Sequence, residues 1–393
     1  MYLARKCLGL VFLLWLSIAV QAQTKGLIAS VPIQMKGKQI LIKVSVNQQE
    51  AVWFVFDSGA SHNMIDGQYA QKLGLEVTDS TWVAGFSGKK QTAQSKGNEL
   101  RIGESLTTDM ALTFVRNLDP SGQVKGYLGG SFLRQNVVSV DYHKRLFSVY
   151  DSQIFDYSGP GEQLYADHRV GVPAIQSSLF LNGDTLLNGW FFIDTGASAS
   201  VLCNPWVEKE FQCISQFDKT HEVKLTGYGG GFSTIMGRSD SLCIGQLALP
   251  GVPVQMQVTS APVSPSSHIY YGFIGADVLG RSKVYFDYQH LRLILEPNKF
   301  WNLPFHVKPG GFTLGFNQLT QQIVVNAVMP HTSCANAGLQ AGDILLEVNG
   351  TAVSRQTMQA ILQKAMKTGP VVQVIIQRAG IPHAFSFMLE DVV

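Results

Sequence analysis

The chain has 393 residues, of which 46% are hydrophobic and only 15% are charged, and 38 are glycines. This length predicts two or three domains at about 100–200 residues each, and the scarcity of charge argues against a disordered chain. The formal net charge of +2 falls to zero once Arg5 and Lys6 are set aside with the first 22 residues. A neutral chain lacks the basic surface that nucleic-acid binding or electrostatic recruitment to membranes requires.

Residues 1–22 are typical of a secretory signal peptide. Arg5 and Lys6 precede an apolar run from Leu8 to Val20, and the small residue Ala22 closes the segment. The run is too short for a stable membrane span, so no span is expected after the signal is removed. The sequence therefore predicts an exported protein, periplasmic or secreted.

Four cysteines follow the signal: Cys203, Cys213, Cys243 and Cys334. None of them has a Cys-x-x-Cys or Cys/His spacing that binds metal, so no metal and no cofactor is expected. In an exported chain Cys203 and Cys213 could form a disulfide, or they could be buried thiols that pack as small apolar residues. The sequence leaves both alternatives open.

The chain contains an internal duplication. The segment Trp53–Ser61, WFVFDSGAS, returns as Trp190–Ser198, WFFIDTGAS. Three further segments recur in the same order: Leu100–Gly103 as Leu242–Gly245, Tyr127–Gly130 as Phe273–Ala276, and Val140–Tyr142 as Phe286–Tyr288. The separation grows only from 137 residues at the first match to 146 at the last. Four collinear matches with small insertions indicate a duplicated domain.

The two repeats extend over residues 26–155 and 164–297, and the turn-forming segment Ser158–Gly161 lies between them. Their apolar runs are short and rich in β-branched and aromatic residues, so each half is expected to be mainly β with one short helix. A third module at 310–393 has a helical stripe over Met358–Met366, followed by strand patterns. The predicted architecture is two related β lobes and a small α+β domain.

The tripeptides Asp57–Gly59 and Asp194–Gly196 stand at the same place in each repeat, directly after an apolar run. One such tripeptide is typical of an ordinary turn. Two of them, each at the end of a predicted strand, would face each other if the lobes are related by a two-fold axis. Two carboxylates that share a site do not both ionise easily, so one holds a proton while the other is charged. That pair suits general acid–base hydrolysis of a peptide bond by water.

Both repeats resemble the lobes of retropepsin-like aspartic peptidases over most of residues 27–297, and the single chain resembles the bilobal pepsin-like arrangement. The resemblance implies that Asp57 and Asp194 form the catalytic dyad. It also implies that the apolar-Gly pairs Leu128-Gly129 and Ile274-Gly275 pack beneath the active-site loops. The neighbours of the aspartates, Ser58, Gly59, Thr195 and Gly196, are expected to support these loops, with the two hydroxyls bracing one loop against the other.

A Gly-aromatic-x-Gly pattern occurs in both repeats, as Gly85-Phe86-Ser87-Gly88 and as Gly227-Tyr228-Gly229-Gly230. Glycine supplies turn and hinge conformations, and an aromatic ring could cover a bound peptide. We expect Gly85, Phe86, Gly227 and Tyr228 to form two β-hairpin flaps over the substrate. The alternative is a pair of ordinary hairpin turns with exposed aromatic residues.

The C-terminal segment Ala337–Gly350, AGLQAGDILLEVNG, is similar to the AGL-x-x-GD-x-I-x-x-VNG core of PDZ domains. The preceding Thr313–Phe316, TLGF, fits the carboxylate-binding loop of that family. The resemblance implies that Leu314, Gly315 and Phe316 bind a peptide C-terminus that adds as an edge strand. The alternative is a PDZ domain that only packs against the lobes. Together with the signal peptide, this motif indicates a bacterial protein.

The sequence therefore predicts an exported aspartic endopeptidase that hydrolyses peptide bonds with water activated by Asp57 and Asp194. Its partners would be a peptide or protein substrate and a C-terminal peptide ligand at the PDZ domain. Two alternatives stay open: a catalytically inactive peptide-binding scaffold, and a peptidase that is active only as a homodimer. Intact aspartates and paired flaps favour the enzyme.

Overall fold

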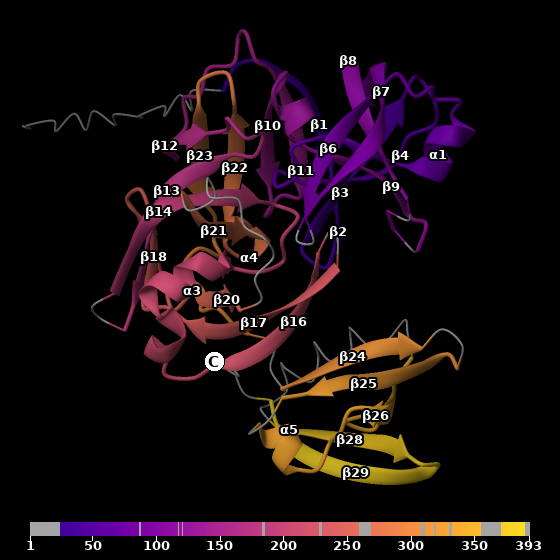
Figure 1. Cartoon of the computed structure of the whole chain (residues 1–393), viewed down its shortest axis with the longest axis vertical. Helices are drawn as coiled ribbons and strands as arrows, with labels where there is room; N and C mark the ends of the chain where they lie inside the picture. Colours follow the sequence, from indigo (N-terminus) through magenta and orange to yellow (C-terminus); the bar gives the residue numbers. More distant parts are fainter. Residues whose placement is uncertain are drawn as a thin grey trace, which may run out of the picture.

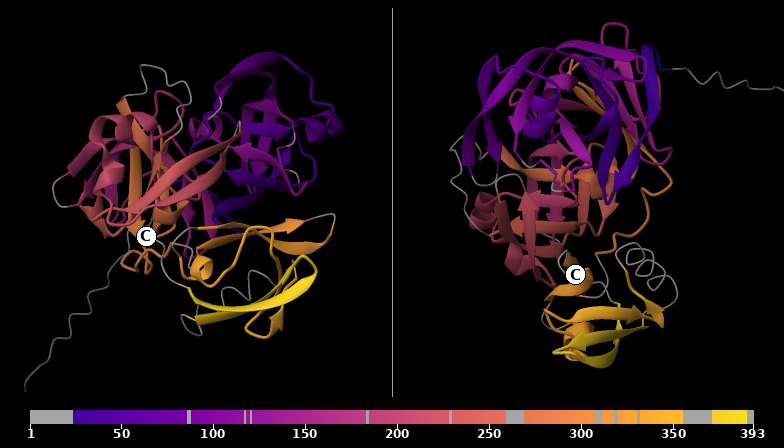
Figure 2. Two further views of the ribbon diagram at one scale, coloured as in Figure 1. Left: turned by 60° about the horizontal axis from the view of Figure 1, so that its bottom comes forward. Right: turned by 90° about the vertical axis from the view of Figure 1, so that its right-hand side faces the viewer.

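The computed structural model describes residues 24–85, 88–116, 118–119, 121–182, 185–227, 230–258, 269–307, 311–317, 320–329, 332–354 and 371–389. These residues are mainly β-strand, so the predicted fold class is confirmed. Figure 1 shows two β lobes, formed by the two repeats, and a separate small group of strands formed by the C-terminal module. The views in Figure 2 agree on this arrangement. The predicted signal peptide lies outside the described residues.

The secondary structure of the first repeat consists of β1 (Leu27–Pro32), β2 (Gln34–Lys36), β3 (Gln39–Val46), β4 (Val52–Phe56), β5 (Met64–Asp66), α1 (Gly67–Lys72), β6 (Asp79–Gly85), β7 (Gly88–Ile102), β8 (Ser105–Val115), β9 (Val124–Leu128), α2 (Gly130–Leu133), β10 (Asn136–Asp141) and β11 (Leu146–Asp151).

The second repeat consists of β12 (Glu162–Asp167), β13 (Ala174–Leu181), β14 (Thr185–Asp194), β15 (Val201–Cys203), α3 (Pro205–Phe211), the 3₁₀ turn η1 (Cys213–Gln216), β16 (His221–Gly227), β17 (Gly230–Arg238), β18 (Ser241–Ile244), β19 (Leu247–Pro250), β20 (Pro253–Gln257), β21 (Tyr270–Gly275), α4 (Ala276–Leu279), β22 (Ser282–Asp287) and β23 (Arg292–Pro297). The C-terminal module consists of β24 (Phe312–Asn317), β25 (Gln322–Val328), α5 (Ser333–Asn336), β26 (Ile344–Val348), β27 (Thr351–Ala352), β28 (Val371–Arg378) and β29 (Ile381–Met388).

Strands of both repeats share one sheet, which runs in the order β1-β11-β10-β22-β23-β12 where the lobes meet. There β10 and β22 are antiparallel, with Val138 opposite Phe286 and Val140 opposite Val284. The 146-residue separation of the repeats relates Val138 to Val284 and Val140 to Phe286. Exchanging the repeats therefore maps this pairing onto itself, so a pseudo-two-fold axis passes between β10 and β22 (Figure 1).

The core explains why the apolar runs before the aspartates form strands. Phe56 is fully buried, and its ring meets Phe147 of the first repeat at 5.0 Å and Phe286 of the second at 5.5 Å, both edge-on. Edge-to-face packing of this kind stabilises a core beyond the area that it buries. The end of β4 is thus fixed against strands from both lobes, one residue before Asp57.

Each lobe contains two short α-helices where the sequence predicted one. The four-residue helices α2 and α4 follow the apolar-Gly pairs, where the resemblance to aspartic peptidases places a short helix, so α1 and α3 are the additional ones. Helices of six and seven residues are too short to show a clear 3.6-residue periodicity, which is why the pattern did not predict α1 and α3. In the C-terminal module, the predicted helix over Met358–Met366 lies outside the described residues, and the strands beyond it are present as β28 and β29.

Among the described residues, no helix combines the length and apolarity that crossing a membrane requires.

Candidate active site

Each D-[ST]-G tripeptide begins where a buried strand ends beside a parallel neighbour. Strand β4 pairs in parallel with β9, and the amide of Asp57 donates to the carbonyl of Leu128 at 2.9 Å. In the second lobe β14 pairs in parallel with β21, with Asp194 opposite Gly275. Both aspartates therefore leave their sheets at equivalent points, next to the predicted apolar-Gly pairs.

The structure brings the carboxyl groups of Asp57 and Asp194 together, and a hydrogen bond joins them. Burial raises the pKa of both groups, and the charge of Asp194 contributes to placing the pKa of Asp57 well above its usual range. Oδ1 of Asp194 accepts from the amides of Gly196 at 2.8 Å and Ala197 at 2.9 Å, and these bonds favour its charged form. Oδ1 of Asp57 likewise accepts from the amide of Gly59 at 3.0 Å, so each carboxyl group is held by the backbone of its own loop.

The two glycines of the motif are required by close approach between the lobes. A Cβ atom added to Gly59 would lie 2.4 Å from Cγ of Asp194, and one added to Gly196 would lie 2.6 Å from Cγ of Asp57. Real Cβ atoms do not approach carbon atoms so closely, so any larger residue would displace the opposite carboxyl group. Each glycine thus makes room for the other lobe's aspartate.

Ser58 and Thr195 join the two loops by four reciprocal hydrogen bonds. Oγ of Ser58 donates to the carbonyl of Ile193 at 2.7 Å and accepts from the amide of Thr195 at 3.0 Å. Oγ1 of Thr195 donates to the carbonyl of Phe56 and accepts from the amide of Ser58, both at 3.0 Å. Both residues are fully buried, so the hydroxyls satisfy backbone groups that no water reaches.

The glycines of the apolar-Gly pairs lie against the active-site loops. A Cβ atom on Gly129 would lie 2.5 Å from the carbonyl oxygen of Ala60, and one on Gly275 would lie 2.3 Å from that of Ala199. The two amides are satisfied differently: Gly129 donates to Oδ1 of Asn63 at 3.0 Å, and Gly275 donates to the carbonyl of Ser200 at 2.9 Å.

Asn63 and Tyr127 are site residues that the sequence analysis did not assign. Asn63 is fully buried and fixes Gly129 through its side chain, but the other repeat has Ser200 at this position, which hides the role in a comparison of repeats. Tyr127 packs against the buried cluster that contains Ala60 of the aspartate loop, and burial with the charges of Asp57 and Asp119 raises its pKa. The repeat comparison could have indicated Tyr127, because it directly precedes Leu128 and aligns with Phe273.

Both predicted flaps begin as β-hairpins. Strands β6 and β7 pair up to Gly85 opposite Gly88, and β16 and β17 pair up to Gly227 opposite Gly230. Val83 of the first hairpin packs in a buried cluster with Ala60 of the aspartate loop. The second hairpin projects from its lobe toward the first lobe (Figures 1 and 2). The predicted covering residues Phe86 and Tyr228 lie outside the described residues.

In the C-terminal module, Leu314, Gly315 and Phe316 lie on β24, the terminal strand of the order β24-β25-β26-β28-β29. The Asn-Gly of the VNG motif forms the turn between β26 and β27, where Asn349 has a φ of 47° and Gly350 a φ of 71°. Two positive φ values in succession match the tight hairpin turn that Asn-Gly favours. Oδ1 of Asn349 also accepts from the amide of Gln373 at 2.9 Å.

The four cysteines have free thiols. Cys203, Cys213 and Cys334 are buried, as packed thiols would be, and burial raises the pKa of Cys213 to about 12. No group of three or more His, Cys, Asp or Glu side chains able to hold a metal ion occurs in the part of the chain that the structure describes.

Residues 42–132 match the sequence model of the aspartyl protease family, and residues 303–377 match that of the PDZ domain. The aspartic proteinase from Irpex lacteus, a solved structure, is 14% identical with a TM-score of 0.48, over 70% of this chain and 98% of that one.

A curated relative, the magnetosome formation protease MamE of Magnetospirillum gryphiswaldense, is 38% identical over 58 residues. The match covers 15% of this chain and only 8% of the length of that protein. The predicted resemblance to aspartic peptidases and PDZ domains is confirmed. The chain combines an aspartyl protease-like domain with a PDZ domain.

Proposed function

We propose that the protein is an aspartic endopeptidase whose two lobes together form one active site. One observation carries the proposal: the carboxyl groups of Asp57 and Asp194, from two repeats of one chain, share a hydrogen bond and both have raised pKa values. The loops that hold them are joined by hydrogen bonds of Ser58 and Thr195. Acid–base hydrolysis of a peptide bond needs a pair of carboxyl groups that share one proton.

In this mechanism the charged carboxylate of Asp194 accepts a proton from a water molecule, which attacks the carbonyl carbon of the peptide bond. Asp57 donates its proton to the carbonyl oxygen at the same time, giving a tetrahedral diol. The carbon–nitrogen bond then breaks as a proton passes from the dyad to the leaving nitrogen. The hydrogen bonds from Gly196 and Ala197 hold Asp194 in the charged form that this first step requires.

The test is hydrolysis of a peptide library by the purified chain, followed by mass spectrometry over a range of pH. We expect Asp57→Asn and Asp194→Asn to lower the cleavage rate by about 10³-fold or more. Asp141→Asn is the matched control, because Asp141 only accepts from the amide of Lys144 in a surface turn. Cleavage by Asp57→Asn at the wild-type rate would overturn the dyad assignment.

Peptide binding, dilution and active-site titration separate the two alternatives. If the wild type and the variants all bind peptides and none of them cleaves a peptide, the protein is a peptide-binding scaffold. A peptidase that needs a homodimer loses activity on dilution, whereas an intramolecular dyad takes one active-site inhibitor per monomeric chain. The intramolecular form is favoured because Asp57 and Asp194 of one chain already share a hydrogen bond.

We further propose that the PDZ domain binds peptide C-termini beside β24. The support is the position of Leu314, Gly315 and Phe316 on the terminal strand of the sheet, where a peptide can add as a further strand. Peptides with a free C-terminal carboxylate should bind the full chain more tightly than their amidated forms. Equal affinity for the two forms would exclude carboxylate recognition.

Export is the remaining part of the proposal and rests on residues 1–22. Expression of the full chain in a bacterial host should yield a periplasmic or secreted protein that begins near Gln23. N-terminal sequencing of the mature protein checks this, and an uncleaved cytoplasmic product would contradict it.

A further inference from the structure

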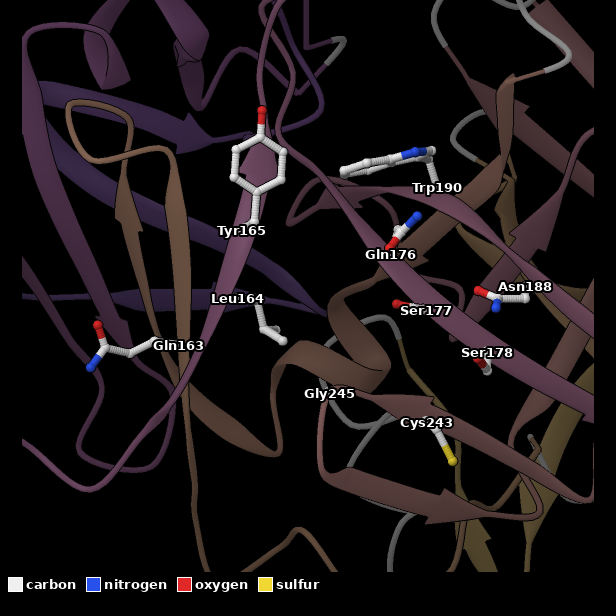
Figure 3. A pocket seen from close by; sticks show the side chains of 10 residues that line it. All are labelled: Gln163, Leu164, Tyr165, Gln176, Ser177, Ser178, Asn188, Trp190, Cys243 and Gly245. Carbon is white, nitrogen blue, oxygen red and sulfur yellow. The ribbon is translucent and has the colours of Figure 1, made fainter.

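The second lobe contains a cavity of about 380 Å³ on the side of β12, β13, β14 and β18 (Figure 3). It arises because β12 changes partners: residues Glu162–Tyr165 pair with β23, and only Ala166 and Asp167 pair with β13. Strand β18 joins the same edge of β13 further along, from Ser178 onward. A notch is left at Gln176 and Ser177, and the cavity occupies it.

Two aromatic side chains form a corner of the cavity. The rings of Tyr165 and Trp190 are 5.9 Å apart and inclined at 74°, and Figure 3 shows both at the same end. Tyr165 is 60% exposed, so its ring is available to a ligand. Aromatic rings exposed in a cavity bind the apolar faces of ligands at low entropic cost, because few torsions must be fixed.

The rest of the lining residues are uncharged and, apart from Leu164, Cys243 and Gly245, polar. Three primary amides, those of Gln163, Gln176 and Asn188, line the cavity, and each can both donate and accept hydrogen bonds. Nη1 of Arg292 donates to Oε1 of Gln163 at 2.8 Å, which fixes that amide, while Nε of Arg292 is paired with Asp287. The polar groups are therefore partly ordered before any ligand arrives.

We propose that this cavity binds a neutral saccharide of one or two rings. A sugar ring presents a C–H face to Tyr165 and Trp190, and its hydroxyls both donate to and accept from amides such as Gln176. The lining side chains are uncharged, so none of them would pair with a phosphate or another ion. The unpaired edge of β13 is too short for an added peptide strand, which usually needs at least about three residues. The inference is independent of the proposed peptidase reaction.

The experiment is calorimetric titration of the full chain with neutral disaccharides of glucose, galactose, mannose and N-acetylglucosamine. Uronic-acid disaccharides and neutral tripeptides serve as comparators. We expect at least one neutral disaccharide to bind with a Kd of about 1 mM or lower. Tyr165→Ala and Gln176→Ala should each weaken binding about tenfold, and Tyr165→Phe should retain most of it.

Trp82→Ala is the matched control, because Trp82 is 61% exposed on β6 of the other lobe. The affinity of Trp82→Ala for the disaccharide should equal that of the wild type. Thermal melting checks that every variant is folded. Absence of binding by all four neutral disaccharides overturns the proposal. So does binding that persists unchanged in Tyr165→Ala and Gln176→Ala, or preferential binding of the charged saccharides or the tripeptides.

Discussion

Gly59 of the first lobe packs against the carboxyl group of Asp194 in the second, with no space for a side chain between them. A Cβ atom at Gly59 would lie 2.4 Å from Cγ of Asp194. The reciprocal contact of Gly196 with Asp57 makes the arrangement two-fold symmetric. The two aspartates are thus positioned by each other's loops as well as by their own.

Gly59→Ala should therefore abolish most peptide hydrolysis while the chain still folds. The added methyl group displaces Asp194, and a displacement of about 1 Å in a catalytic group can cost about 10²-fold in rate. The measurement is kcat/KM on a peptide substrate. Gly67→Ala is the control, since its Cβ atom would meet only the carbonyl oxygen of Val115 at 3.7 Å. Equal rates of peptide hydrolysis for the two variants would show that the contact between Gly59 and Asp194 does not position the carboxyl group for catalysis.

The hydroxyl bridge between the loops predicts a stability effect. Thr195→Ala leaves the carbonyl of Phe56 and the amide of Ser58 buried without their partner. An unsatisfied buried group costs about 1–3 kcal/mol, so the free energy of unfolding should fall by at least that amount. Thr195→Ser keeps the hydroxyl and should remain near the wild type. Denaturation by urea measures both, and equal stability of the alanine and serine variants would contradict the prediction.

The raised pKa values predict how stability depends on pH. The pKa of Asp57 lies well above the ordinary 3.8 because of burial and the charge of Asp194. A raised pKa means that the folded state holds its proton more tightly than the unfolded state does. The resulting stability is fully present below about pH 3.8 and is lost as the pH rises through the folded-state pKa.

Asp57→Asn replaces the carboxyl with a group that stays neutral at every pH. The variant should be more stable than the wild type near neutral pH, and the difference should shrink as the pH falls toward that ordinary value. Urea denaturation at several pH values checks this, with Asp141→Asn as control. A variant less stable than the wild type at neutral pH would mean that Asp57 is stabilised in its charged form.

The repeated motif allowed the lobes and the aspartate pair to be predicted from sequence. Trp53–Ser61 and Trp190–Ser198 share composition and order, so a two-fold relation follows without knowledge of the packing. The pairing of Val138 with Phe286 could not be predicted, because residues so far apart in the chain carry no local signal of their register. Asn63 was missed for a different reason: only the first lobe uses a side chain to satisfy the amide of Gly129.

The PDZ domain contains an ion pair between a buried carboxylate and a half-buried arginine, and its effect on stability has the opposite pH dependence. Asp343 is 1% exposed and accepts from Nε and Nη2 of Arg378, both at 2.7 Å. Burial raises the pKa of Asp343, but the hydrogen bonds from Arg378 and the amide of Gln340 outweigh this and lower it below 3.8. Stability from this pair is therefore present above about pH 3.8 and lost as the pH falls through the folded-state pKa.

Asp343→Asn should accordingly loosen the PDZ domain at neutral pH. Hydrogen exchange of peptides that cover Gly338–Asp343 should accelerate by about tenfold or more, because the half-buried guanidinium of Arg378 loses its carboxylate partner. Glu347→Gln on β26 is the control and should exchange like the wild type. Unchanged exchange in Asp343→Asn would show that the pair contributes nothing to local stability.

Arg281 anchors the segment that leads from the second lobe to the PDZ domain. It is 9% exposed and donates to the carbonyls of Phe300, Trp301, Leu303 and Pro304. Its guanidinium also lies 3.5 Å from the ring centroid of Phe305. A planar fork can serve several carbonyls and stack on a ring at once, which an ammonium group cannot do.

Arg281→Lys should therefore release residues 300–305 even though the charge is kept. Limited proteolysis should cut between the lobes and the PDZ domain faster than in the wild type, by about tenfold, because local opening costs less free energy once these carbonyls lose their donor. Cleavage of short peptides at the dyad should stay near the wild-type rate, since Arg281 lies outside the aspartate loops. Arg116→Lys, on the first lobe, is the matched control. If Arg281→Lys resists proteolysis as the wild type does, the anchor depends on the apolar burial of Trp301 and Phe305.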